Sequence, residues 1–378
     1  MRNEVKSAFG GDIKNLKIAI FYDWLNQWGG AERVLIDILR LYPQATIFSL
    51  IHNYSKIDWL PANTKVITSF INKLPFSKNN PIFYTPLYSF ALEKFDFSKF
   101  DIVISTTSSL GHCFLTPPKT LFICYLHNTN RYLYQTPPKY KFISPLLKNY
   151  QKTDFIYAQR PDYLLCNSKT VQKRILINYR RSSQIIYPGV DTDFFTPSKI
   201  KLDSNYFLVV SRLVAHKKID IAIKACHKLK KKLIIVGIGR EKNKLISLKN
   251  KLKDQNIIFM GKVSDKKLKI LYQNCQALIC PQFEDYGLTP IEVQACGRPV
   301  IAFNKGGITE TVIDKKTGLF FSHQTTKSLQ KTLIQFDTKE FSQQDCVDNA
   351  KKFSKQNFMI NFSHTIDKLW QLHLNTSL

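Results

Sequence analysis

The chain has 378 residues, more than one hydrophobic core usually supports, so its length favours two domains. Lys and Arg outnumber Asp and Glu by 55 to 28, and the net charge of +27 favours phosphorylated metabolites, anionic lipid or nucleic acid as partners. Hydrophobic residues make up 44%, yet no run approaches the roughly 18 apolar residues that cross a bilayer. This composition argues against a disordered chain and against a membrane-spanning one.

The eight cysteines are scattered through apolar runs and form no CxxC pair. They are interpreted as buried thiols in a reducing compartment, without a disulfide framework or a zinc site. The first 15 residues lack the apolar core of a signal peptide. We therefore expect a cytoplasmic protein that touches a membrane only at its surface.

The first half alternates short apolar runs with helical segments, a pattern typical of a parallel sheet with crossover helices. We predict an N-terminal domain over residues 15–190, with strands at 16–24, 45–51, 101–107, 120–127, 162–168 and 183–190. After a Pro-rich, polar passage the alternation restarts. The second domain is predicted over 191–354, with strands at 206–213, 232–239, 257–263, 277–282 and 298–303.

Helices are predicted at 219–229 and 264–275, the latter with Ser264 as its N-cap. Apolar side chains at helical spacing also predict a C-terminal helix over 355–378 that packs on the first domain. The fold class is thus α/β with two domains, each built on a parallel sheet.

Arg212 and Lys217 follow the first strand of the second domain, at the sheet edge where open α/β folds bind ligands. Two such cations can hold a diphosphate. A surface Arg and Lys pair is nevertheless common in so basic a chain. Gly237 and Gly239 follow the next strand, where glycines let backbone N–H groups approach phosphate.

The stretch "FEDYGLTPIE" (283–292) places Glu284 and Glu292 on either side of Gly287, before and inside a predicted helix. The helix start adds the backbone N–H groups of Gly287, Leu288 and Thr289. Carboxylates accept from hydroxyls and N–H groups donate to phosphate, so a nucleotide sugar would use both. Alternatively, Glu292 lies on a solvated helix face and Glu284 pairs with a lysine.

The stretch has the E-x7-E pattern of retaining glycosyltransferases of family 4, and the chain resembles that family over most of its length. The matching segments are "WGGAERV" (28–34), "YLHNTNRYLY" (125–134), "RPDYLLCNSKTVQKRI" (160–175), "IIYPGVDTDFF" (185–195), "SRLVAHKKIDIAIKA" (211–225), "VGIGRE" (236–241) and residues 281–312. The resemblance implies the GT-B fold, in which two Rossmann-like domains with parallel sheets face each other across a cleft.

The resemblance also implies roles for individual residues. Arg212 and Lys217 match the pair that holds the donor diphosphate, Glu284 faces the transferred sugar, and Glu292 accepts from the nucleotide ribose. His127 matches a first-domain histidine that reaches the donor sugar. The whole expected donor-binding set is Gly29, Gly30, Arg212, Lys217, Gly237, Gly239, Val263, Glu284, Gly287, Leu288, Thr289 and Glu292. One departure is Lys218, where members of the family commonly have glycine.

These parts imply a metal-free, retaining hexosyl transfer in which the cations stabilise the leaving phosphate. One Asp-x-Asp triplet, Asp191-Thr192-Asp193, is present within the matching segment 185–195, and neither a metal nor another cofactor is expected. GDP-mannose is the first expectation for the donor, from similarity to bacterial polysaccharide mannosyltransferases, and a UDP-hexose is the second. The acceptor is expected to be a glycan or a lipid-linked sugar.

Residues 131–152 interleave cations with aromatic rings and contain no acid, and residues 70–90 have a similar character. Such segments suit an anionic lipid surface, so peripheral attachment to the inner face of the cell membrane is expected. A partly buried loop with solvated lysines is the alternative.

Two other functions stay open from the sequence. The charge is compatible with a non-enzymatic nucleic-acid-binding protein, although no nucleic-acid module is recognisable. A sugar-nucleotide epimerase or hydrolase of the same fold would act on the donor without an acceptor.

Overall fold

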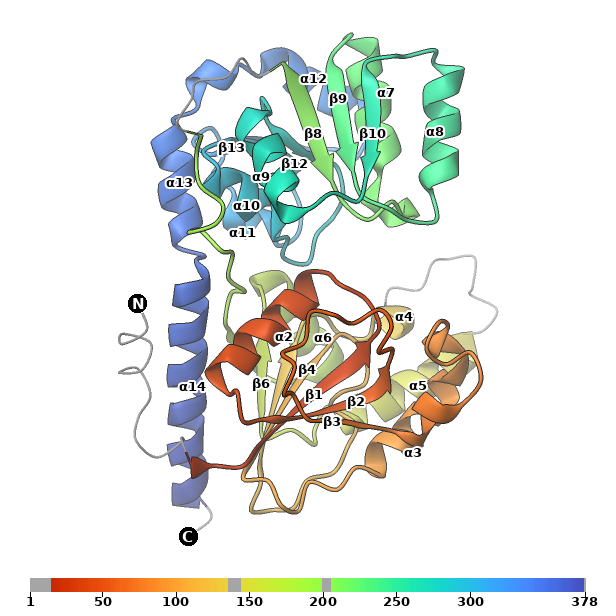
Figure 1. The fold of residues 1–378 in the computed structure, drawn as a ribbon, viewed down its shortest axis with the longest axis vertical. Helices are drawn as coiled ribbons and strands as arrows, with labels where there is room; N and C mark the ends of the chain where they lie inside the picture. The colour runs from red at the N-terminus through yellow and green to blue at the C-terminus, as the bar shows by residue number, and fades with distance from the viewer. Residues whose placement is uncertain (1–14, 135–143, 199–204, 377–378) are drawn as a thin grey trace. The chain divides into compact units, whose positions relative to one another are not determined.

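The chain forms two units in a computed structural model that describes residues 15–134, 144–198 and 205–376. Unit 1 comprises residues 1–188 together with 358–378, and unit 2 comprises residues 189–357. Each unit is a twisted parallel sheet with helices against it (Figure 1). The prediction of two Rossmann-like α/β domains is confirmed.

The sheet of unit 1 has the strand order β3-β2-β1-β4-β5-β6-β7, with all neighbours parallel. Its strands are β1 (Ile18–Leu25), β2 (Thr46–His52), β3 (Val66–Thr68), β4 (Ile102–Thr107), β5 (Leu121–Leu126), β6 (Tyr163–Cys166) and β7 (Gln184–Ile185). The central strands are buried along almost their whole length, as expected for a sheet covered on both faces.

Helices cover both faces of this sheet. They are α2 (Gly30–Leu41), α3 (Tyr88–Glu93), α4 (Arg131–Tyr134), α5 (Ser144–Tyr157), α6 (Lys169–Tyr179) and α14 (Lys355–Thr376), with 3-10 turns η2 (Phe70–Lys73) and η3 (Pro81–Leu87). One core lies between the sheet, α2 and α14, to which α14 contributes Phe358, Phe362, Ile366, Leu369 and Trp370. The other core lies on the opposite face, where α3 and α6 pack.

The sheet of unit 2 has the order β10-β9-β8-β11-β12-β13, again with all neighbours parallel. Its strands are β8 (Tyr206–Val210), β9 (Lys232–Val236), β10 (Ile257–Gly261), β11 (Leu278–Cys280), β12 (Val300–Phe303) and β13 (Gly318–Phe321).

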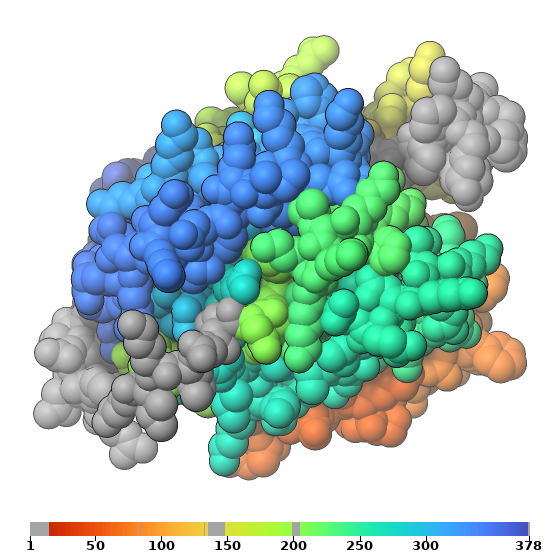
Figure 2. Space-filling model, turned by 90° about the horizontal axis from the view of Figure 1, so that it is seen from above, coloured from red at the N-terminus to blue at the C-terminus, as the bar shows by residue number. Residues whose placement is uncertain are grey.

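The helices of unit 2 are α7 (Ile219–Lys228), α8 (Lys242–Lys251), α9 (Asp265–Asn274), α10 (Thr289–Ala295), α11 (Ile308–Thr311), α12 (Thr326–Gln335) and α13 (Gln343–Lys351), with 3-10 turns η5 (Ala215–Lys217) and η6 (Thr338–Glu340). Figure 2 looks onto the side of unit 2 where α7, in green, adjoins α12, in blue.

Local predictions can be compared with these elements. Ser264 caps α9 as predicted, because its hydroxyl accepts from the Lys267 backbone N–H. All eight cysteines are buried and none forms a disulfide, which confirms the interpretation as buried thiols. The strands β3 and β13 were not predicted, since three or four residues at a sheet edge leave too short an apolar run for a periodic pattern.

Candidate functional site

The strand order places one switch point in each sheet. In unit 1 the chain reverses direction across the sheet between β1 and β4, and in unit 2 between β8 and β11. Ligands of open α/β folds bind beyond the carboxyl ends of the strands at such points.

In unit 2 the loops after β8 and β11 meet in an ion pair. The Lys217 Nζ lies 2.5 Å from the Glu284 Oε1, and their side chains are 12% and 19% exposed. The same carboxylate oxygen accepts from the Gln282 Nε2 at 2.7 Å. Gln282 is buried, and its Oε1 has no hydrogen-bond partner among the described residues. Sequence reasoning missed Gln282, although it stands directly after the β11 apolar run.

Arg212 lies in the same loop as Lys217. Arg212 is exposed, and its guanidinium has no ion-pair partner among the residues that the structure describes. The backbone of this loop is hydrogen-bonded to the end of β9 and the loop that follows it. The Ser211 N–H donates to the Val236 carbonyl, and the Leu213 N–H donates to the Ile238 carbonyl. One cation is thus paired in the loop and a second faces solvent.

Gly237 and Gly239 allow these two loops to approach. A Cβ on Gly237 would lie 1.9 Å from the Ser211 carbonyl oxygen, and one on Gly239 would lie 2.3 Å from that of Leu213. The Gly237 N–H donates to the Gly261 carbonyl at 2.8 Å. In this structure both glycines shape the loop that carries Arg212, a role that spacing alone did not suggest.

Lys218, the departure from the family pattern, has φ +53° in the left-handed region. That conformation favours glycine and costs other residues about 1 to 2 kcal/mol. The preference for glycine at this position therefore has a backbone cause, and the lysine adds a further exposed cation next to Lys217.

The loop that bears Glu284 is fixed by its backbone. Glu284 bridges to Gly306, and its carbonyl accepts from the Gly307 N–H at 2.8 Å. Gly287 has φ +95°, which releases the chain into α10. Within the described residues, the backbone N–H groups of Gly287, Leu288 and Thr289 are not donors to another loop or turn.

Glu292 and Val263 complete the predicted set in unit 2. Glu292 is 2% exposed in the first turn of α10, and its Oε2 accepts from the Tyr272 hydroxyl at 2.7 Å. It therefore does not lie on a solvated helix face. Val263 is half-buried in the turn between β10 and α9.

In unit 1, His127 lies directly after β5 at the carboxyl edge of the sheet. Its residue is 9% exposed, and its Nε2 is 2.9 Å from the Thr106 Oγ1. Burial lowers the pKa of this imidazole to about 4, so the ring is uncharged at neutral pH. It can exchange a hydrogen bond with a hydroxyl but does not supply a cation.

Asp23, at the end of β1, is a titratable group that sequence reasoning missed. Its Oδ1 accepts from the Thr107 hydroxyl at 2.6 Å and its Oδ2 from the Ser108 N–H at 2.8 Å. Burial raises the pKa of this carboxyl to about 6, although these hydrogen bonds oppose the shift. The carboxylate joins the end of β1 to the end of β4.

The glycine turn of unit 1 opens α2 beside this edge. Gly29 is the N-cap and has extended backbone, with φ −171°, while Gly30 is the first helical residue and is exposed. Glu32 in the first turn is buried and accepts from the Tyr22 hydroxyl at 2.6 Å. An acid at this helix start offsets part of the positive end of the helix dipole.

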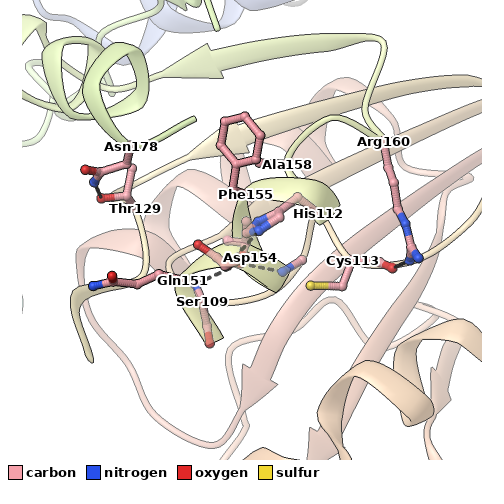
Figure 3. A network of polar contacts seen from close by, with 12 residues as sticks. Ser109, His112, Cys113, Thr129, Gln151, Asp154, Phe155, Ala158, Arg160 and Asn178 are labelled. Atoms are coloured by element: carbon pink, nitrogen blue, oxygen red, sulfur yellow. Dashed lines mark hydrogen bonds and ion pairs between the residues drawn. The ribbon is translucent and has the colours of Figure 1, made fainter. Parts of the chain in front are cut away.

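A buried polar cluster supports the turn that follows His127 (Figure 3). The His112 Nε2 and the Asp154 Oδ1 are 2.9 Å apart, with side chains 0% and 1% exposed. Asn178 donates to the Thr129 hydroxyl at 3.0 Å, and Asn167 donates to the His127 carbonyl at 3.1 Å. The bonds of Asn178 and Asn167 hold the 127–130 turn against α6 and the residues just before it, while the His112 and Asp154 pair joins the loop after β4 to α5.

Comparisons with known proteins agree with this arrangement. Residues 28–194 match the family described as Glycosyltransferase Family 4, and residues 190–353 match Glycosyl transferases group 1. The chain carries the two domains of a GT-B glycosyltransferase. The boundary between the matches falls at the link between unit 1 and unit 2.

Curated relatives match over part of their length. The alpha-1,3/1,6-mannosyltransferase ALG2 of Dictyostelium discoideum is 27% identical over 258 residues, which cover 55% of this chain and 61% of that protein. An uncharacterized glycosyltransferase of Methanocaldococcus jannaschii is 26% identical over 215 residues, 56% of this chain and 60% of the relative. The GT-B chain thus spans about 60% of these relatives.

Solved structures match over nearly the whole chain. The sucrose-phosphate synthase of Thermosynechococcus elongatus has a TM-score of 0.78 at 16% identity, covering 95% of this chain and all of that one. HepE of Anabaena in complex with UDP-glucose has a TM-score of 0.70 at 18% identity, with 94% and 100% coverage. At these identities the likeness establishes the GT-B fold.

Two features are absent from the described residues. No helix in them combines the length and the apolar character needed to span a bilayer. The same part of the chain has no group of three or more His, Cys, Asp or Glu side chains placed to hold a metal ion.

Proposed function

We propose that this protein is a retaining glycosyltransferase that moves a hexose from a nucleotide sugar to a glycan or lipid-linked acceptor. The observation that carries the proposal is the Lys217 and Glu284 pair, with exposed Arg212 in the same loop, at the switch point of unit 2. Cations at this position suit a diphosphate, and carboxylates suit the hydroxyls of a sugar and a ribose.

In the proposed reaction the bond between the sugar C1 and the diphosphate oxygen breaks with oxocarbenium character. Negative charge builds on the leaving oxygen, where Arg212 and Lys217 stabilise it as preorganised cations. A phosphate that binds Lys217 shares or replaces the contact with Glu284. This frees the carboxylate to accept from a sugar hydroxyl, while neutral His127 serves as a further hydrogen-bonding group.

Retention is proposed to follow from attack on the same face, with the departing phosphate taking the proton of the acceptor hydroxyl. No metal is required, because the two cations supply the positive charge. A covalent glycosyl-enzyme adduct detected by mass spectrometry would overturn this step, and an inverted product anomer would overturn retention.

The donor is proposed to be GDP-mannose, with a UDP-hexose second. The name of the ALG2 relative supports mannose, whereas the HepE structure contains UDP-glucose. A thermal-shift screen of GDP-, UDP- and ADP-sugars tests the choice, because a true donor stabilises the fold by mass action. We expect the largest rise in Tm with GDP-mannose, and no rise with any nucleotide sugar would contradict the function.

Product analysis then separates transfer from the alternatives. Release of free sugar or of an epimerised donor without an acceptor would indicate a hydrolase or an epimerase.

We propose that the protein acts in the cytoplasm at the inner face of the cell membrane. The net charge of +27 supports attachment to an anionic lipid surface. Of the two basic, aromatic segments, residues 131–152 lie partly outside the described residues and residues 70–90 lie within them.

A further inference from the structure

Unit 1 exposes a group of large apolar side chains in the segment from η2 to α3. They are Phe70, Phe76, Phe83, Leu87 and Phe90, with exposed fractions of 38%, 78%, 78%, 41% and 56%. We name this group the η2–α3 surface. All five lie within residues 70–90, and exposed large apolar side chains gathered in this way indicate an interaction surface. Phe76 also has φ +56°, an uncommon strain for a bulky residue.

A pocket opens beside the η2–α3 surface. Its volume is about 650 Å³, within the range of pockets that hold small amphiphilic ligands. Five phenylalanines line it, namely Phe48, Phe70, Phe90, Phe95 and Phe100. The rings of Phe70 and Phe90 meet edge to face with centroids 5.9 Å apart. The wall of the pocket is therefore largely hydrocarbon.

Lysines accompany this apolar lining. Lys65, Lys94 and Lys99 also line the pocket, where Asp96 is the single acid among the lining residues. The Lys94 Nζ lies 5.1 Å from the centre of the Phe90 ring. Lys73 and Lys78 line a second hollow between η2 and η3. An occupant that matches both features has an anionic head and an apolar chain.

We propose that the η2–α3 surface docks unit 1 onto an anionic phospholipid bilayer, and that the pocket receives one acyl chain. The lysines face the lipid phosphates, while the exposed rings enter the interface, where aromatic side chains are favoured. A second copy of the chain fits less well, since a symmetric contact would bring identical lysines together. A nucleic acid would satisfy the lysines but leave the hydrocarbon-lined pocket unfilled.

This surface deepens the membrane location given above and does not depend on the identity of the donor. Its residues are distinct from Arg212, Lys217 and Glu284, which belong to unit 2. Loss of lipid binding and loss of donor binding are therefore separable. A variant can lose one while the Tm shift caused by a nucleotide sugar measures the other.

The test is co-sedimentation of the full chain with vesicles of phosphatidylcholine, with and without phosphatidylglycerol. We expect binding only to the anionic vesicles, and less of it at higher salt. The Lys94→Gln/Lys99→Gln variant is expected to bind about fivefold more weakly for each lysine removed. Phe90→Ser is expected to weaken binding at unchanged charge. Equal binding to neutral vesicles would overturn the proposal.

The controls lie on one face of α12 in unit 2, which carries Lys327, Lys331 and exposed Ile334. Lys327→Gln/Lys331→Gln makes the same change in charge, and Ile334→Ser likewise replaces an exposed apolar side chain by serine, both away from the η2–α3 surface. They are expected to bind vesicles like the unaltered protein. If they weaken binding as much as the unit 1 variants do, net charge alone explains the attachment and the specific surface is wrong.

Depth is tested with Phe90→Trp in vesicles whose acyl chains carry bromine. Quenching of the added tryptophan above that of the native chain is expected when the ring reaches the hydrocarbon, and its absence would overturn insertion. Glycerol phosphate, a free phosphate ester, is expected to leave the fluorescence unchanged. Competition of vesicle binding by single-stranded RNA, lost in Phe90→Ser, would identify a nucleic-acid surface instead.

Discussion

The two units use the same sheet edge in opposite ways. At the switch point of unit 1, the Asp23 carboxylate is buried and accepts from the Thr107 hydroxyl and the Ser108 N–H. At the switch point of unit 2, the corresponding loops hold the Lys217 and Glu284 pair, with Arg212 exposed. At the unit 1 edge a buried carboxylate bonds to the end of β4, whereas the unit 2 edge carries cations.

Similar topologies thus carry different side-chain contacts at the same sheet edge. A buried acid bonded on both oxygens ties two strand ends together and has little capacity left for a ligand. A partly exposed lysine whose partner is a movable carboxylate can exchange that partner for an anion. The comparison predicts that changes at the unit 1 edge alter stability and pH dependence, whereas changes at the unit 2 edge alter donor binding and turnover.

The largest expected effect is on turnover in Lys217→Met. Removing a cation that is proposed to stabilise the leaving phosphate is expected to lower kcat/KM by about 100- to 1000-fold, as for the loss of one oxyanion donor. The change is measured by steady-state transfer from the donor identified by thermal shift. The neighbouring Lys218→Met serves as the matched control. A similar fall in both variants would mean that general charge, not Lys217, carries the effect.

The second prediction concerns pH and unit 1. Burial raises the pKa of Asp23 from 3.8 to about 6 and lowers that of His127 from 6.5 to about 4. Each shift corresponds to about 3 kcal/mol of linked stability. The Asp23 contribution is complete below pH 3.8 and is lost as pH rises through about 6. That of His127 is complete above pH 6.5 and is lost as pH falls through about 4.

The two contributions therefore oppose each other between pH 4 and 6.5. In Asp23→Asn only the contribution of His127 to the pH dependence remains. The free energy of unfolding is therefore expected to fall more steeply on acidification than in the unaltered chain. In His127→Gln only the contribution of Asp23 remains. The free energy of unfolding is therefore expected to rise on acidification relative to the unaltered chain. Urea unfolding at several pH values measures both slopes. Identical slopes in the two variants would refute the assignment.

A smaller effect is expected in Gln282→Ala. The Gln282 amide donates to the same Glu284 oxygen that pairs with Lys217, so its loss leaves the carboxylate less well oriented. We expect kcat to fall about fivefold, equivalent to about 1 kcal/mol for one hydrogen bond. Gln282→Asn shortens the amide and is expected to behave like alanine. Unchanged kcat in both variants would show that Glu284 needs no such support.

The smallest prediction is a gain in stability in Lys218→Gly. Relief of the left-handed conformation at φ +53° is expected to exceed the entropic cost of glycine by up to about 1 kcal/mol. Lys331→Gly, inside α12, is the contrasting control and is expected to destabilise. Urea midpoints compare the two, and a loss of stability in Lys218→Gly would show that the lysine side chain outweighs the strain.

The sequence predicted the parts that repeat along the chain. Continuous apolar strands and intervening helices indicated two parallel sheets, and the position of Arg212 and Lys217 after the first strand of the second domain pointed to a sheet edge. Periodicity reports burial along one element, so it located β1 and β8 but not short edge strands such as β3.

Contacts between distant loops could not be predicted in the same way. The bonds of Lys217 to Glu284 and of Asp23 to Thr107 join residues whose partnership depends on the final register of neighbouring strands. A glycine in a loop likewise gives no sign of what it approaches. The spacing of Gly237 predicts an approach to phosphate, and it gives no sign of the close packing against the Ser211 carbonyl that the structure shows.

The last long helix has a consequence for biosynthesis. Phe358, Phe362 and Trp370 of α14 fill the core of unit 1, yet they follow all of unit 2 in the sequence. During translation at about 5 to 20 residues per second, the ribosome must add the whole of unit 2 before this core can close. The nascent first unit therefore spends on the order of ten seconds or more with an exposed apolar face. During this period it is expected to be a substrate for chaperones.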